Sequence, residues 1–411
     1  MKIRSLLLGS IAAAGLATTG YAADLGVVTS LDVCDELGLS GLTISSDDNC
    51  LQITGSVTFE YDWGNYEPGV LYATFAGGDD YTVIDNAGGL DSKADVDAWL
   101  QFVGTADSDF GPASATIKLL SENNNGMAGP AGPLDPTPWD ILVDEAWVGI
   151  GDTTMLMAGK KSSIFADGDD APLNYLGLFN SSNVDVGVGF SKTSPTTGGA
   201  VIQVVSNLGN GLSIGGGVEN LQTSSPAVIT GVGVLSYAGD GITAHAAGAI
   251  DQAGLWKVHA GFKGTWDPIT IVGAVAANNG WWNVLGSASA TFDMFTLAVS
   301  GEATSASEWG VGGSLAAAVT DTVKLNLGGR YFSGTVDNVY QIEAGVSAAV
   351  TETITLTAAV GAEDSTGAPG AIYGKAGLAW APGGGFTASI DGEANTLGAY
   401  KATFKAAKSI K

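Results

Sequence analysis

The clearest hydrophobic pattern in the chain runs from Cys50 to Tyr61. Because a strand points successive side chains to opposite faces, this stretch is predicted to be a strand with one apolar and one polar face. The apolar face fits either the core of a soluble antiparallel sheet or the lipid-facing side of a transmembrane barrel, whose other face lines a water-filled lumen. The apolar or glycine positions are Leu51, Ile53, Gly55, Val57, Phe59 and Tyr61, and the polar positions between them are Gln52, Thr54, Ser56, Thr58 and Glu60.

The same alternation recurs along the chain and is interrupted by regularly spaced turns. From residue 199 the tight turns include Leu208-Gly209-Asn210-Gly211, Ala238-Gly239-Asp240-Gly241 and Trp266-Asp267-Pro268-Ile269. Polar and Gly/Pro turns of this sort join antiparallel strands. Looser connections, such as 219–226, lie between consecutive tight turns. Short turns at one end and longer loops at the other are typical of an outer-membrane barrel.

The spacing of these turns predicts the number of strands. A first strand, nine hairpins and a last strand at 399–408 give twenty strands, and the range is 16–20 if one or two hairpins belong to loops. Each is near ten residues, which is enough to cross a bilayer when tilted. We expect a long loop at 63–93 and the longest irregular stretch between strands at 162–198. The predicted fold is all-β, a closed antiparallel transmembrane β-barrel.

Composition favours the barrel over a soluble sheet. Only 14% of residues are charged and the mean hydropathy is +0.24, which is apolar for a soluble domain. Most apolar strand positions are Ala, Gly, Val and Leu, whereas a sandwich core requires bulkier inner faces. The net charge of −26 argues against nucleic acid as a partner.

Basic residues share one face of the predicted strands. In 256–266, Lys257, His259 and Lys263 alternate with Val258 and Phe262. A Lys or Arg that faces lipid at mid-depth costs about 2–4 kcal/mol, so this face is expected to meet water. The predicted lumen wall comprises Lys118, Lys257, His259, Lys263, Lys324, Arg330, Lys375, Lys401 and Lys405.

Aromatic residues lie near the predicted strand ends and fit an interfacial girdle. The alternative, that they are ordinary core or edge aromatics, remains open at this stage. The residues are Tyr61, Trp256, Trp266, Tyr331, Tyr340, Trp380 and Tyr400.

The N-terminus has the features of an export signal. Lys2 and Arg4 precede a short apolar run at 6–16, and small residues precede a predicted cleavage site after Ala22. We therefore expect a signal peptide at 1–22, a periplasmic lead-in at 23–49 and the barrel at 50–411. Loss of the two basic residues changes the net charge from −26 to −28.

The chain has two cysteines, Cys34 and Cys50. In an oxidising compartment an isolated pair this close predicts a disulfide, and the loop model gives it about 3 kcal/mol. The alternatives are two free thiols or a metal pair, for which the neighbouring sequence lacks further ligands.

No enzyme motif stands out. The only histidines, His245 and His259, have no serine elbow or metal spacing near them, so we expect no catalytic residues, no cofactor and no metal. Two acidic clusters, Asp79-Asp80 and Asp167-Gly168-Asp169-Asp170, are either solvated loops or calcium ligands. Their spacing does not match a calcium loop.

Several motifs together resemble the general porins of alphaproteobacterial outer membranes. In order they are Val33-Cys34-Asp35, Cys50-Leu51-Gln52-Ile53-Thr54-Gly55, Asp144-Glu145-Ala146-Trp147-Val148, Ala158-Gly159-Lys160 and Leu208-Gly209-Asn210-Gly211-Leu212-Ser213. The resemblance covers most of the first 220 residues. It implies a trimer of sixteen-stranded diffusion pores, each with a long loop folded inward as a constriction. By position that loop is 162–198, which places Asp167, Asp169 and Asp170 at the constriction.

These observations lead to one expected function and one rival. We expect an outer-membrane porin of a Gram-negative bacterium, with outer-membrane lipid and two further copies as partners. It passes small hydrophilic solutes and ions. Weak cation selectivity follows if acids at the narrowest point outweigh wall lysines, because the Debye length is about 8 Å. The rival is an exported β-rich surface or adhesion protein without a pore.

Overall fold

The protein is described by a computed structural model that covers residues 32–46, 48–73, 81–126, 141–178, 187–190, 192–221, 228–335, 337–366 and 368–411. The expected signal peptide, Asp79 and Asp80 lie outside the described residues. Among the residues described, no helix is long and apolar enough to cross a membrane.

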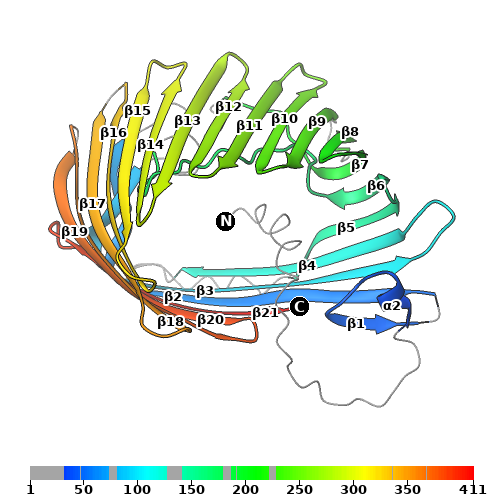
Figure 1. Cartoon of the computed structure of the whole chain (residues 1–411), viewed down its shortest axis with the longest axis horizontal. Coiled ribbons are helices and arrows are strands. Elements are labelled where there is room, and N and C mark those ends of the chain that lie inside the picture. Colours follow the sequence, from blue (N-terminus) through cyan, green and yellow to red (C-terminus); the bar gives the residue numbers. More distant parts are fainter. Residues whose placement is uncertain are drawn as a thin grey trace.

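Twenty antiparallel strands in this part of the chain pair in sequence order and close into a barrel (Figure 1). The ring is closed by the pairing of β2 with β21, which runs from Gly55 opposite Ile410 to Asn65 opposite Tyr400. This confirms the predicted count of twenty and not the sixteen that the family resemblance implies. The strands are β2 (Cys50–Ala73), β3 (Tyr81–Ala106), β4 (Ala113–Gly126), β5 (Leu142–Gly151), β6 (Thr154–Lys161), β7 (Gly199–Gly209), β8 (Leu212–Glu219), β9 (Thr230–Gly239), β10 (Ile242–Asp251), β11 (Trp256–Trp266), β12 (Ile269–Asn278), β13 (Trp281–Phe292), β14 (Phe295–Thr304), β15 (Trp309–Ala318), β16 (Val323–Ser333), β17 (Asn338–Ala349), β18 (Ile354–Ser365), β19 (Ala368–Gly383), β20 (Phe386–Asn395) and β21 (Tyr400–Ile410).

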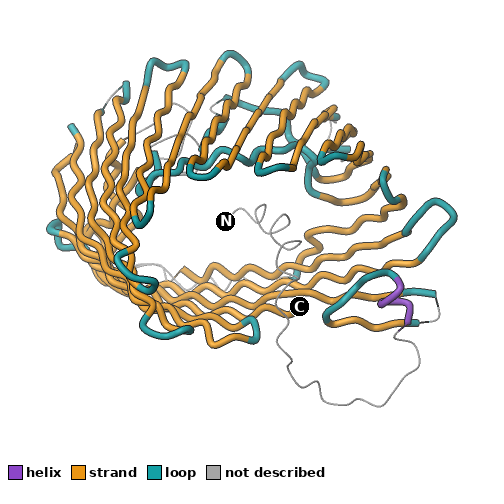
Figure 2. The backbone as a smooth tube through the Cα atoms, in the orientation of Figure 1, coloured by secondary structure: helices purple, strands orange, loops and turns teal. Residues whose placement is uncertain are grey.

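The tight turns form where the sequence predicts them, and Figure 2 shows them as short teal segments between orange strands. Asn210 and Gly211 both have positive φ, and so do Asp240 and Gly241. Two successive positive φ angles match the right-handed twist of the flanking strands, and Asn-Gly and Asp-Gly are the pairs that adopt them readily. Local turn chemistry therefore sets the register of these hairpins.

Two expectations about loops are wrong. The stretch 63–93 is not one long loop, because β2 continues to Ala73 and β3 begins at Tyr81. The predicted contrast between short turns and long loops also fails in the second half of the barrel. There β12 and β13 are joined by Asn279 and Gly280 alone. In β2 and β3, strand pairing extends through polar and glycine residues because cross-strand hydrogen bonds do not depend on alternating side chains.

The lead-in before the barrel contains a short helix, α2 (Asp32–Glu36), and a short strand, β1 (Leu42–Ser45), which the sequence did not predict. β1 pairs with the start of β2, from Leu42 opposite Ile53 to Ser45 opposite Cys50. It occupies the edge of β2 just beyond the end of β21, and Gly41 lies beside Lys411.

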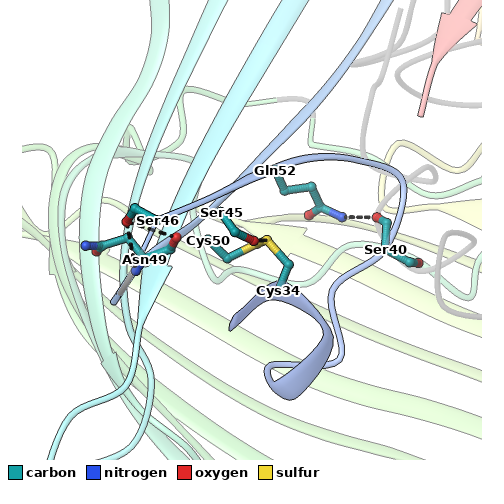
Figure 3. Close-up of a disulfide and its surroundings, with 7 residues drawn as sticks. All are labelled: Cys34, Ser40, Ser45, Ser46, Asn49, Cys50 and Gln52. Atoms are coloured by element: carbon teal, nitrogen blue, oxygen red, sulfur yellow. Dashed lines mark hydrogen bonds between the residues drawn. A yellow bond between two sulfur atoms is a disulfide. The ribbon is translucent and has the colours of Figure 1, made fainter. Parts of the chain in front are cut away.

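The predicted disulfide is present and links α2 to the first residue of β2 (Figure 3). The Cα atoms of Cys34 and Cys50 are 5.0 Å apart. Ser45 donates a hydrogen bond to the Cys34 sulfur at 2.8 Å, and Gln52 Nε2 donates one to the Ser40 carbonyl at 2.9 Å. These contacts hold the α2–β1 unit against the barrel.

The two faces of the barrel wall differ sharply. On one face, large aliphatic side chains such as Val299 (64% exposed), Ile342 (54%) and Ile390 (59%) are open to the surroundings. The opposite face carries buried polar and ionisable side chains, among them His259, Gln203 and Glu343. We call these the apolar face and the polar face.

Candidate functional site

Between β6 and β7, the described residues of the 162–198 segment, which are 162–178, 187–190 and 192–198, lie against the polar face of the wall. Its outward course is hydrogen-bonded to strand after strand. Gln203 Nε2 on β7 donates to the Ser162 carbonyl at 3.0 Å, and the Leu173 amide donates to Ser287 Oγ on β13 at 2.9 Å. Further on, an Arg330 guanidinium nitrogen on β16 donates to the Leu176 carbonyl at 2.7 Å. Residues 162–178 thus contact the wall from β7 to β17.

Residues 187–190 and 192–198 lie along the same face. The Gly189 amide donates to Asn283 Oδ1 on β13 at 3.3 Å, and Lys257 Nζ on β11 donates to Thr197 Oγ1 at 3.0 Å. At its base Glu219 on β8 accepts from both arms, from the Ile164 amide at 3.1 Å and the Gly198 amide at 2.6 Å. A single buried carboxylate, which is 0% exposed, therefore joins the two ends of the excursion.

Apolar contacts add to these hydrogen bonds. Leu178 and Val188 of the segment pack in a buried cluster with Val272, Ala274 and Leu285 of the wall. Phe165 packs in a second cluster with three residues of β9 and β10, which are Val232, Ala247 and Ala249. In both clusters the larger side chains of the segment pack against aliphatic side chains of the wall.

Glycines on the polar face mark the path of the segment. A Cβ on Gly261 would lie 2.7 Å from the His245 ring and closer still to the Gly168 carbonyl oxygen. One on Gly312 would lie 2.6 Å from the Asn174 amide nitrogen, and one on Gly345 would lie 2.5 Å from the Tyr175 hydroxyl. These contacts are shorter than real Cβ contacts, so the close approach depends on glycine.

Two of the three predicted acids contact the two histidines. His245 on β10 and His259 on β11 are hydrogen-bonded, Nε2 to Nδ1, at 2.8 Å. Asp169 Oδ2 is 3.3 Å from His245 Nδ1, and Asp170 Oδ2 is 3.8 Å from His259 Nε2. The hydrogen bond with His245 lowers the pKa of Asp169 below its usual value, and Thr243 and Lys263 act in the same direction. Asp167 lies two residues before this group.

A second polar cluster anchors the far end of the outward course. The Tyr175 hydroxyl donates to Glu343 Oε1 at 2.6 Å, and the Tyr373 hydroxyl donates to Glu343 Oε2 at 2.7 Å. Gln341 Nε2 donates to the Tyr373 hydroxyl and its Oε1 accepts from Arg330 Nε, both at 2.7 Å. Burial and the Glu343 carboxylate raise the pKa of Tyr175, so it stays a donor at neutral pH.

The predicted wall cations occupy several kinds of environment. Four lysines form ion pairs with carboxylates: Lys118 with Asp144 at 2.5 Å, Lys375 with Glu343 at 3.5 Å, Lys401 with Asp62 at 3.3 Å, and Lys405 with Glu60 at 2.8 Å. Lys257, His259 and Arg330 contact the 162–198 segment. Lys263 and Lys324 are exposed.

Several residues that build this site were not predicted from sequence. The alternation of Gln341, Glu343 and Gly345 on β17 matches that of Lys257, His259 and Gly261 on β11. Polar residues followed by a glycine on one strand face were the sequence signal from which these site residues could have been predicted. In the described part of the chain, no three His, Cys, Asp or Glu side chains are arranged to hold a metal ion.

Comparison with known proteins gave matches among solved structures alone. No protein-family model matches the sequence, and no curated protein does. A mutant of Rhodopseudomonas blastica porin is 12% identical, with 87% of this chain and 99% of that chain covered and a TM-score of 0.41. A loop-deletion mutant of OmpT from Vibrio cholerae is 9% identical (88% and 100% covered, TM-score 0.34). The DcaP channel of Acinetobacter baumannii is 11% identical (90% and 100%, TM-score 0.36).

Proposed function

We propose that the protein is a porin of a bacterial outer membrane, with the polar face lining a water-filled channel. The observation that carries this proposal is the division of a closed barrel wall into an exposed aliphatic face and a polar face that holds the 162–198 segment. Lipid accepts the aliphatic face, whereas buried carboxylates and lysines require water or partners.

Aromatic side chains support the orientation in a membrane. Trp266 and Trp380 lie near one end of their strands and are 45% and 43% exposed. Near the opposite strand ends, Trp309 and Tyr340 are 47% and 50% exposed. Two such rows match the aromatic girdles at the two interfaces of a membrane.

We further propose that the 162–198 segment narrows the lumen. The channel then passes small hydrophilic solutes and ions by passive diffusion, with weak cation selectivity. Ion pairing of four wall lysines reduces their effect on anions. Asp167 and the carboxylates of Asp169 and Asp170 add negative charge where the segment meets the wall. A narrow region lined by one sign of charge concentrates its counter-ions.

We assign no catalytic role to any residue and expect a homotrimer in outer-membrane lipid. Chemical cross-linking of the detergent-solubilised protein tests the oligomer. A monomer at all protein concentrations contradicts the trimer but not the channel.

Planar-bilayer recording tests the channel itself. Purified protein should insert as discrete conductance steps, and shortening the 162–178 arm should increase the step size. The rival, an exported surface or adhesion protein without a pore, is favoured if the folded, heat-modifiable barrel enters bilayers and gives no conductance.

A further inference from the structure

The two histidines of the chain form a pair with a carboxylate at each end. The ring planes of His245 and His259 are nearly parallel, with 5° between them, and Nε2 of His245 is 2.8 Å from Nδ1 of His259. Asp169 lies beside His245 Nδ1 and Asp170 beside His259 Nε2. The pair belongs to the wall and both carboxylates belong to the 162–198 segment, so the four groups join the two structures.

When Asp169 is ionised and both histidines are neutral, one ring nitrogen of the pair has no donor to accept from. The ionised Asp169 carboxylate only accepts, so the proton of a neutral His245 lies on Nδ1. His245 Nε2 then accepts from His259 Nδ1–H. His259 Nε2 is left as a bare acceptor that faces the acceptor oxygen of Asp170 at 3.8 Å.

The contact between His259 Nε2 and Asp170 is buried. The His259 side chain is 1% exposed and that of Asp170 13%. Nε2 of His259 has no hydrogen-bond partner among the residues described. Two acceptors that face each other without a donor leave a buried polar atom unsatisfied, which is unfavourable. One added proton would turn this contact into a charge-assisted hydrogen bond, whichever of the ring nitrogens binds it.

Among the described residues around the pair, the other charged groups are one carboxylate and two lysines. From the segment, Asp167 lies nearby, and Phe190 packs against His259. From β11, Lys263 acts on Asp169, and Lys257 lies over the rings of Phe165 and Phe190. Thr243 on β10 donates to Asp169 at 2.6 Å. The strand neighbours of the pair, Ser236 on β9 and Ala276 on β12, carry no charge.

We propose that the His245–His259 pair is a proton-binding site that fastens the 162–198 segment to the wall when it takes up one proton. With the proton bound, both carboxylates of the segment are hydrogen-bonded to the pair. Without it, Asp169 alone is bonded to the pair, and Asp170 Oδ2 accepts from the Val188 amide at 3.2 Å. Histidine changes charge between about pH 5 and 8, so the segment is held more tightly at the acidic end of this range.

Amide hydrogen exchange of the detergent-solubilised barrel tests the proposal. Protection of the backbone at 164–174, corrected for the intrinsic pH dependence of exchange, should rise about tenfold from about pH 8 to about pH 5.5, because one charge-assisted hydrogen bond is gained. Unchanged protection across this range would overturn the proposal.

Two variants distinguish proton binding by the His245–His259 pair from proton binding by other groups. In Asp170→Asn the amide donates to His259 Nε2 without a proton, so protection should be high and independent of pH. In His259→Phe it should be low and independent of pH. Asp167→Asn, which removes the same charge from the same segment, should retain the pH dependence. A tenfold rise that persists in Asp170→Asn and His259→Phe would contradict the assignment.

Ring nitrogen chemical shifts of His259 test the proposal in the unmodified protein. Proton uptake by the pair should follow the same pH curve as amide protection.

The effect on current rests on the proposed channel function. There, acidification should reduce open-channel fluctuations in the wild type and leave Asp170→Asn unchanged. Absence of any channel would contradict the porin proposal. It would not affect the exchange result, and therefore not the proposed proton-binding site.

Discussion

Single glycines determine how closely the 162–198 segment approaches the wall. Gly261 lies between His259 and Lys263 on the polar face of β11, and the segment backbone at Gly168 passes directly over it. Any side chain at this position would separate Asp169 from His245. The glycine is therefore a contact position and not a turn position.

Gly261→Ala should displace the segment, because the new Cβ would meet a backbone carbonyl that cannot rotate away. We expect larger conductance steps and weaker amide protection of 164–174, with the barrel still folded. Gly286→Ala is the matched control, since a Cβ there meets nothing within 4 Å. Equal behaviour of the two variants would show that the segment does not depend on this contact.

The disulfide acts on a short unit at the edge of β2. Replacing both Cys34 and Cys50 by Ser should remove about 3 kcal/mol of constraint from the α2–β1 unit. Hydrogen exchange should show lost protection for Leu42–Ser45, while the pairing of β2 with β21 persists. If β1 stays protected in the double variant, its hydrogen bonds to β2 suffice to hold it.

At the level of elements, the far end of the segment's outward course depends on one buried carboxylate. Glu343 on β17 is 5% exposed and accepts from Tyr175 of the segment and from Tyr373 on β19. Lys375 adds a longer contact. The network joins the segment to strands that are remote from it in sequence.

Tyr175→Phe should weaken this anchor by about 1–2 kcal/mol, because a hydrogen bond to a charged acceptor is lost. The expected result is faster amide exchange at 173–176 and more frequent current fluctuations. Tyr340→Phe removes a similar tyrosine–carboxylate bond, to Asp364, from the apolar face, and should change neither. Identical exchange in the wild type and Tyr175→Phe would argue against the anchor.

At the scale of the whole molecule, charge is unevenly distributed. The chain carries 42 acidic and 16 basic residues, and four of the predicted wall lysines are paired with acids. Buried acids such as Glu302 and Glu363 also lie on the polar face. The balance favours cations if that face lines the lumen.

Neutralising Asp167, Asp169 and Asp170 together by Asn should shift the reversal potential in a salt gradient toward anion selectivity. The shift should diminish at high salt, where the Debye length falls to about 3 Å at 1 M. A wild-type channel that is already anion-selective would mean that the basic wall residues outweigh these acids.

Local patterns in the sequence determined most of the barrel. Alternation from Leu51 to Tyr61 and pairs such as Asn210-Gly211 specify strands and turns through short-range geometry, so the count of twenty and the disulfide were predictable. Strand ends were not, since β2 and β3 extend by cross-strand hydrogen bonds that residue type does not reveal. The tertiary structure alone decided that His245 meets His259 and that both meet Asp169 and Asp170. Those contacts join groups up to 89 residues apart, from Asp170 to His259. They depend on the curvature of the closed wall and on glycines whose role appears only when the segment lies against them.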